Sequence, residues 1–140
     1  MCVDPKNKLE KLLSYEIGMF NDTCREFGSF HKLNQFYKNL LIESFALHTR
    51  VLIDFFYCDN KKYKNDLIAQ DLLPPSIIWK DNRPDMLVVL KEAKRKADKQ
   101  LAHLSTDRIK LESENKNGWQ VVKIKLEMDK VIESFLNLRS

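Results

Sequence analysis

The fold is organised around the segment NLLIESFALHTRVLIDFFYC, residues 39–58. Its apolar residues go almost all the way round a helix instead of forming one stripe, which is typical of a buried helix. One set of large side chains recurs at steps of three and four residues and shares its face with Ser44 and His48. This set consists of Leu41, Phe45, Leu52, Phe55 and Phe56. We therefore expect residues 39–58 to lie at the centre of a helical domain.

A second face of the same helix carries three ionisable residues, Glu43, Arg50 and Asp54. At roughly 100° per residue they fall within about 40° of one another. An unpaired charge on so apolar a helix is energetically expensive. We therefore expect these three side chains either to pair with charges on another helix or to belong to a functional site.

Composition indicates one helical domain over residues 1–140. Hydrophobic residues make up 44% of the chain and charged residues 31%, with only three Gly and four Pro. A chain of this length can build a core without disulfides or metals, and so few turn residues disfavour a β protein. No apolar run reaches the roughly 18 residues that span a bilayer, and the first residues lack a secretory signal. We expect a cytoplasmic protein without membrane contact.

Cysteine and histidine spacing gives no sign of a metal site. Cys2, Cys24 and Cys58 are odd in number, widely spaced and not in a CxxC pair, so free thiols are expected. The histidines, at positions 31, 48 and 103, are far apart, and the Glu-x-x-His spacing of di-iron bundles is absent. We expect no metal and no other cofactor.

The net charge of +4 and the pI of about 8.9 permit an anionic partner without requiring one. The densest basic run is Lys91, Lys94, Arg95, Lys96 and Lys99, which Glu92 and Asp98 partly offset. A nucleic-acid binder usually has a stronger excess or a clear basic stripe. A solvated helix face explains the run at least as well.

Apolar periodicity predicts four long helices, over residues 5–27, 33–57, 84–105 and 119–138. The second would begin after a short connector, and the third would open at Pro84 and Asp85. We predict that residues 59–83 form a connector with short helical pieces, because paired prolines interrupt this segment. Residues 107–117 have the composition of a loop. We predict an all-α fold, a four-helix up-down-up-down bundle.

Reactive side chains gather near the end of the third helix. His103 has Lys99 one turn earlier and Lys96 two turns earlier on the same side, with Arg95 on the adjacent strip. A histidine can move protons near neutral pH, and neighbouring cations can hold a phosphate. The alternative is a boundary histidine bonded to a carboxylate such as Glu43. For His48 we expect a satisfied core histidine, and for Trp79 plain packing.

The segments ESFALHTRVLIDFFY, residues 43–57, and ADKQLAHL, residues 97–104, resemble the HEPN superfamily, in particular its uncharacterised and abortive-infection-type bacterial members. The resemblance covers most of the chain. It implies a four- to five-helix bundle, often a homodimer, frequently part of a toxin-antitoxin or phage-defence system. An RNA or an antitoxin is the partner that such a context suggests. Catalytic members are metal-independent ribonucleases with an Arg followed, after four to six residues, by a His.

Only the histidine of that motif carries over, to His103. The positions that the arginine would take hold Lys96, Ala97 and Asp98, and Arg95 lies one residue too far. A ribonuclease needs both a proton shuttle and a cation for the phosphorane-like transition state, a role that suits a forked guanidinium. The absence of the motif arginine therefore predicts a binding or assembly module without nuclease activity.

The alternative is an active ribonuclease. His103 would be its general acid or base, Arg50 or Arg95 its phosphate clamp, and Glu43 a third member of the site. Arg95, Lys96 and Lys99 would then contact RNA phosphates. Both interpretations expect His103 to lie beside Glu43 and Arg50 in a polar seam between packed helices.

Overall fold

The structure is a computed structural model that describes residues 5–102 and 119–139, and every element in those ranges is helical. The elements in chain order are α1 (Pro5–Glu26), η1 (Phe27–Lys32), α2 (Gln35–Tyr57), η2 (Ala69–Leu72), α3 (Trp79–Asn82), α4 (Val88–Ala102) and α6 (Val121–Arg139). No strand is present in these ranges, so the predicted all-α fold is confirmed. No described helix is long and apolar enough to cross a bilayer.

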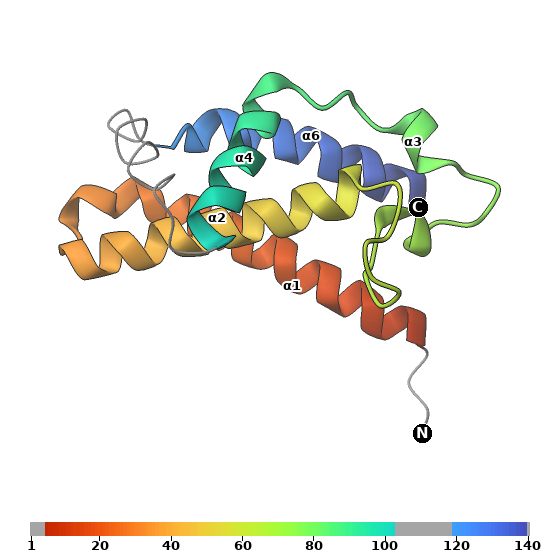
Figure 1. Ribbon diagram of the computed structural model, residues 1–140, viewed down its shortest axis with the longest axis horizontal. Coiled ribbons are helices and arrows are strands. Elements are labelled where there is room, and N and C mark those ends of the chain that lie inside the picture. Colours follow the sequence, from red (N-terminus) through yellow and green to blue (C-terminus); the bar gives the residue numbers. More distant parts are fainter. Residues whose placement is uncertain (1–4, 103–118, 140) are drawn as a thin grey trace.

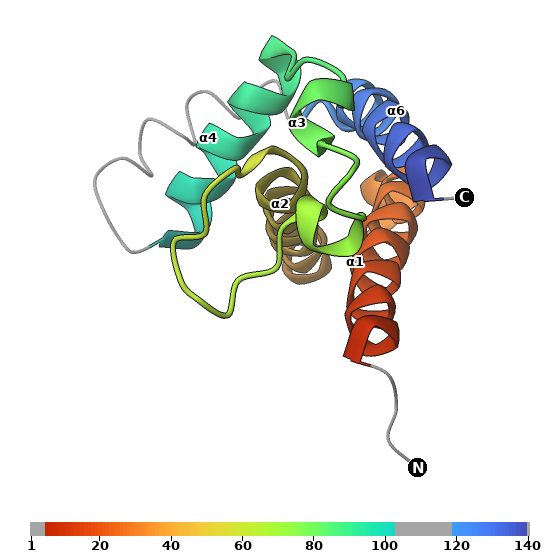
Figure 2. The same ribbon diagram turned by 90° about the vertical axis from the view of Figure 1, so that its right-hand side faces the viewer.

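The long helices pack around α2. Figure 1 shows α1 and α2 lying antiparallel, with α6 above them and running in the same direction as α2. In Figure 2, α2 is seen almost end-on while α4 is seen along its length, so α4 crosses α2 steeply. Thus α1, α2 and α6 follow the predicted alternation of directions, and α4 lies across the bundle.

The link between α1 and α2 is short and ordered by side chains at both ends. The 3₁₀ turn η1 replaces the expected end of the first helix, and Phe27 stacks on Phe30 with ring centroids 5.4 Å apart. Asn34 then caps α2, because its Oδ1 accepts a hydrogen bond of 3.0 Å from the Tyr37 N–H. The helix consequently begins at Gln35, two residues after the predicted start.

The connector between α2 and α4 holds short helical pieces, as the sequence predicted, and these are η2 and α3. Gln70 fixes its path: Nε2 donates to the Ile77 carbonyl at 2.7 Å, and Oε1 accepts from the Trp79 N–H at 2.9 Å. The Trp79 indole is buried and donates through Nε1 to the Phe56 carbonyl at 2.7 Å. The packing role predicted for Trp79 is confirmed, and its hydrogen bond ties the connector to the end of α2.

The predicted start of the third long helix at Pro84 is wrong, because α4 begins at Val88. Tertiary contacts hold the preceding residues out of the helix. The Tyr57 hydroxyl donates to the Pro84 carbonyl at 3.0 Å, and Arg83 Nη1 donates to Asp59 Oδ1 at 2.8 Å. The Leu87 carbonyl is the first to accept from the α4 backbone. The predicted loop at residues 107–117 lies outside the described residues.

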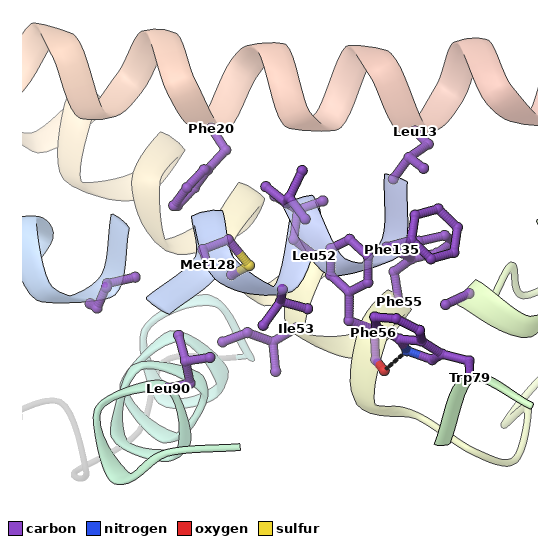
Figure 3. Close-up of a cluster of buried hydrophobic side chains, with 14 of the residues drawn as sticks. Leu13, Phe20, Leu52, Ile53, Phe55, Phe56, Trp79, Leu90, Met128 and Phe135 are labelled. Carbon is purple, nitrogen blue, oxygen red and sulfur yellow. Dashed lines mark hydrogen bonds between the residues drawn. The ribbon is translucent and has the colours of Figure 1, made fainter. Parts of the chain in front are cut away.

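The core surrounds α2 and joins it to the other described elements, including η1, whose Phe27 ring lies 5.4 Å from that of Phe45. Phe135 of α6 is fully buried, with its ring centroid 5.6 Å from Phe55, 5.5 Å from Phe56 and 5.4 Å from Trp79. Figure 3 shows these rings at one end of the core and Phe20 and Met128 farther along it. On α4 the small side chains of Ala93 and Ala97 are buried, so that helix can approach α2 closely. This packing leaves the polar side of α2 facing α4.

Candidate functional site

A cleft of about 840 Å³ opens between α1, α2, α4 and the first part of the connector. Its volume falls in the range of about 300–1,000 Å³ that is typical of ligand sites. Figure 2 shows the connector passing across the end of α2 between α4 and α1. Tyr63 and Leu67 are among the connector residues that line the cleft. The lining contains both apolar side chains and a group of charges, and the two parts have different chemistry.

The apolar part of the cleft comes from three elements. Leu13 of α1 and the α2 side chains Leu52 and Phe55 are buried, and they line its floor. Leu12 and Tyr63 are exposed and lie among the other lining residues. An apolar ligand in the cleft would therefore cover hydrophobic surface that now meets water, which favours binding.

Within the charged part, four side chains form a closed ring that joins α2 to α4. Glu16, Lys62 and Asp66 also line the cleft but are not members of this ring. Arg50 Nε lies 2.9 Å from Asp98 Oδ1, and Asp98 Oδ2 accepts a hydrogen bond of 3.2 Å from Lys94 Nζ. Lys94 Nζ lies 2.9 Å from Asp54 Oδ1, and Asp54 Oδ2 completes the ring 3.9 Å from Arg50 Nε. Positive and negative charges alternate, so the ring as a whole is neutral.

The contact between Arg50 and Asp98 is a close ion pair without hydrogen-bond geometry. Asp98 Oδ1 is shielded from solvent and accepts no hydrogen bond from the described residues, although Arg50 Nε lies 2.9 Å away. The attraction between opposite charges at this distance does not depend strongly on angle. Arg50 is therefore held on the α4 side of the cleft mainly by Coulomb attraction.

Lys94 remains a cation within this ring. Burial lowers the pKa of its ammonium group, but hydrogen bonds and opposite charges from Asp54 and Asp98 outweigh burial, so the pKa lies above its ordinary value of 10.5. An ammonium group with a raised pKa does not release its proton near neutral pH. Lys94 is consequently unsuited to act as a general base in the cleft.

One polar contact between α1 and α2 joins Glu16 to His48. The side chain of His48 is 8% exposed, and its Nδ1 lies 2.6 Å from Glu16 Oε2. The prediction of a satisfied core histidine is confirmed. Sequence reasoning missed Glu16 as the partner, although its position between Leu13 and Phe20 at the edge of the apolar stripe of α1 placed it near α2.

The expected polar seam is wrong for Glu43. Glu43 is exposed on α2, two turns before Arg50 on the same face. Among the described residues, Arg50 pairs with Asp98 and Asp54 instead. The crossing of α4 explains the difference, because it places Asp98 next to Arg50. His103 lies outside the described residues, so its position relative to Arg50 remains a prediction.

The predicted phosphate-binding residues of α4 do not share the cleft. Arg95 pairs with Glu92 on its own helix, with Nη2 and Oε2 3.0 Å apart. Lys96 lies over the ring of Trp119, with Nζ 5.7 Å from the centroid, and Lys99 is half-buried. The basic side chains of α4 therefore lie in different surroundings.

Cysteines and metal-ligating residues provide no further centre in the part of the chain that the structure describes. Cys24 and Cys58 are free thiols there, as expected, and Cys2 lies outside it. Burial, partly offset by the charge of Lys125, raises the pKa of the Cys24 thiol to about 11. No group of three or more His, Cys, Asp and Glu side chains within residues 5–102 and 119–139 could hold a metal ion.

Comparison with known proteins assigns no family: the chain matches no family model, no curated protein and no solved structure. The cleft combines an apolar floor with a charge ring that is already neutral, an arrangement suited to binding.

Proposed function

We propose that the protein is a HEPN-like helical binding and assembly module without nuclease activity, and that the cleft holds its ligand. The all-α fold and the resemblance of residues 43–57 and 97–104 to that superfamily support the family part of the proposal. The same resemblance supports a place in a toxin-antitoxin or phage-defence system. The cleft itself supports the binding part.

One observation carries the proposal: the cations of the charge ring are already engaged by carboxylates. Arg50 faces Asp98 and Asp54, and Lys94 faces the same two side chains. A phosphate group or a phosphorane-like transition state would have to compete with both carboxylates for each cation, and it would also be repelled by them. This arrangement disfavours RNA in the cleft.

The ligand that fits this lining is neutral and mainly apolar. Its body would cover Leu12, Leu13 and Phe55, and the ring would form a polar wall without demanding an opposite charge. Apolar area removed from water contributes about 25 cal/mol per Å². Binding of such a ligand is therefore driven by burial and depends little on ionic strength.

The assembly part of the proposal is supported by an exposed apolar side of α2. Phe36, Leu40 and Leu47 are exposed there, and their spacing places them on one face of the helix. Adjacent exposed apolar side chains are typical of interaction surfaces. We expect a second copy of this chain to cover them, and the molar mass from light scattering checks this.

A titration with a neutral fluorophore, N-phenyl-1-naphthylamine, tests the binding part. We expect saturable enhancement of its fluorescence, with an affinity that stays the same between about 0.05 M and 0.5 M salt. Added single-stranded RNA should not displace the probe. Absence of saturable binding, or displacement by RNA, would contradict the proposal.

Cleavage assays with structured and single-stranded RNA test the absence of nuclease activity. Wild type and the His103→Ala variant should both give background cleavage, because Arg50 and Lys94 of the cleft are already paired with carboxylates. Cleavage by wild type that disappears in His103→Ala would support the ribonuclease alternative, with Arg50 or Arg95 as the phosphate clamp.

A further inference from the structure

A second, smaller depression of about 220 Å³ lies between α4 and α6. Its volume suits a ligand with about one aromatic ring. The side chains that matter for its chemistry are apolar ones from both helices, one indole and two ammonium groups. They are Val89, Ala93, Ile124, Trp119, Lys96 and Lys123. We call this depression the α4–α6 groove.

The groove has a positive charge excess, unlike the cleft. Its one lining carboxylate, Glu92, already pairs with Arg95, whose Nε donates to Glu92 Oε2 at 3.1 Å. No carboxylate within residues 5–102 and 119–139 forms an ion pair with Lys96 or Lys123. Two ammonium groups beside a neutralised carboxylate favour an anion.

Trp119 supplies a fixed apolar wall. Its ring packs against Phe45 of the core, with centroids 5.5 Å apart and planes at 81°. Lys96 Nζ lies 5.7 Å from the centroid of the same ring. A cation held near an aromatic ring creates a site in which an apolar group and a negative charge can be bound side by side. The buried side chains of Ala93 and Ile124 continue the apolar surface.

We propose that the α4–α6 groove binds a small amphipathic carboxylate, a compound with an apolar body of about one ring and a single negative charge. The body would lie against Trp119, Ala93 and Ile124, and the carboxylate would interact with Lys96 and Lys123. This site is separate from the cleft, so the proposal does not depend on the ligand of the cleft.

The test uses 4-phenylbutyrate as the probe and the indole N–H resonances of the full chain as the readout. Trp119 reports on the groove, and Trp79, whose indole is buried and bonded to Phe56, serves as the internal reference. We expect a saturable shift of the Trp119 resonance with 4-phenylbutyrate. The neutral analogue 4-phenylbutanamide should bind about tenfold more weakly, and acetate, which lacks the apolar body, should give no shift.

Charge variants locate the anion. Lys96→Gln combined with Lys123→Gln should weaken 4-phenylbutyrate binding about tenfold and leave 4-phenylbutanamide unaffected. The matched control combines Lys91→Gln with Lys130→Gln, two exposed positions on the same helices outside the groove, and should bind like wild type. Unchanged resonances of Trp79 show that each variant is folded.

Three results would overturn the proposal. The first is a Trp119 resonance that does not shift or does not saturate. The second is equal affinity for 4-phenylbutyrate and 4-phenylbutanamide. The third is equal weakening in the groove variant and in the control variant, which would show a general effect of net charge.

Discussion

Lys94 of α4 reaches across to Asp54 of α2, with Nζ 2.9 Å from Oδ1, and also holds Asp98 on its own helix at 3.2 Å. This contact joins α4 to α2, which it crosses steeply, and closes the charge ring beside the cleft. Because the ring is neutral and all four members are 37–46% exposed, it contributes more to the electrostatics of the cleft than to the stability of the fold.

Replacing Lys94 by Met leaves Asp54 and Asp98 close to each other without their shared cation. We expect the free energy of unfolding to fall by about 1 kcal/mol, since exposed ion pairs contribute about 0.2–1 kcal/mol each. Urea denaturation at pH 7 measures the loss. Lys91→Met, an exposed lysine on the same helix, is the control and should differ little from wild type. Equal losses in both variants would show that the ring does not stabilise the protein.

The difference in the free energy of unfolding between wild type and Lys94→Met has a defined pH dependence. The folded-state pKa of Lys94 is raised above 10.5, so its stabilising contribution is complete below that pH and is lost as the pH rises through the raised value. The gap in stability between wild type and Lys94→Met should therefore be constant from about pH 7 to pH 9 and shrink only at higher pH. A stability difference between wild type and Lys94→Met that disappears below pH 9 would contradict the raised pKa of Lys94.

Glu16→Ala should destabilise the protein by removing the partner of a buried imidazole. The side chain of His48 is 8% exposed, and an unsatisfied buried polar group costs about 1–3 kcal/mol. Glu26→Ala changes an exposed carboxylate at the end of the same helix and should have a small effect. Combining Glu16→Ala with His48→Ala in a double-mutant cycle should give a loss smaller than the sum of the two single losses. Additive losses would mean that the contact contributes nothing.

Arg83→Ala should lower the free energy of unfolding of the protein more at neutral pH than in acid. Arg83 is 14% exposed and donates from Nη1 to the Phe56 carbonyl at 3.2 Å as well as to Asp59. Hydrogen bonds to charged groups contribute about 1.5–3 kcal/mol, so we expect a loss of that order at pH 7. Arg25→Ala, which breaks an exposed pair with Asp22, should cost far less.

The acid dependence follows from Asp59. The hydrogen bond from Arg83 holds the pKa of this carboxyl below its ordinary value of 3.8. Its contribution to stability is therefore present above that pH and is lost as the pH falls through the lowered value. Denaturation of wild type and Arg83→Ala at pH 7 and at about pH 2.5 should show the gap between them narrowing in acid. A stability difference between wild type and Arg83→Ala that widens in acid would contradict the stabilising contact between Arg83 and Asp59.

Alkylation should distinguish the two described thiols. Burial raises the pKa of Cys24 to about 11, so almost no thiolate forms near pH 8, whereas Cys58 is exposed. In a Cys2→Ser background, iodoacetamide at about pH 8 should modify Cys58 well before Cys24, because the thiolate is the reactive form. Peptide mass spectrometry over time gives both rates. Faster modification of Cys24 would show that α1 is not packed as described.

The helices could be predicted from the sequence because each has a local signature. The apolar spacing of α6, from Ile124 through Met128 to Phe135, reports its buried face whatever its neighbours are. The start of α4 could not be predicted in the same way. Its position depends on the hydrogen bond from Tyr57 to Pro84, a contact between residues far apart in the chain.

The candidate site was predictable only in part. Sequence periodicity placed Arg50 and Asp54 on one face of the most apolar helix, and both line the cleft. Their partners Lys94 and Asp98 depend on the angle at which α4 crosses α2, which no local pattern specifies. The expected partner Glu43 was on the correct face of the helix, but it lies exposed two turns away.

The proposed function depends on binding of a neutral apolar ligand in the cleft, which a comparison of two leucine variants tests. Leu12 lines the cleft and is 58% exposed, whereas Leu126 lies on α6 outside it and is 57% exposed. In titrations with N-phenyl-1-naphthylamine, Leu12→Ser should weaken binding by about three- to tenfold, and Leu126→Ser should bind like wild type. Equal affinities in the two variants, or a greater loss in Leu126→Ser, would contradict the claim.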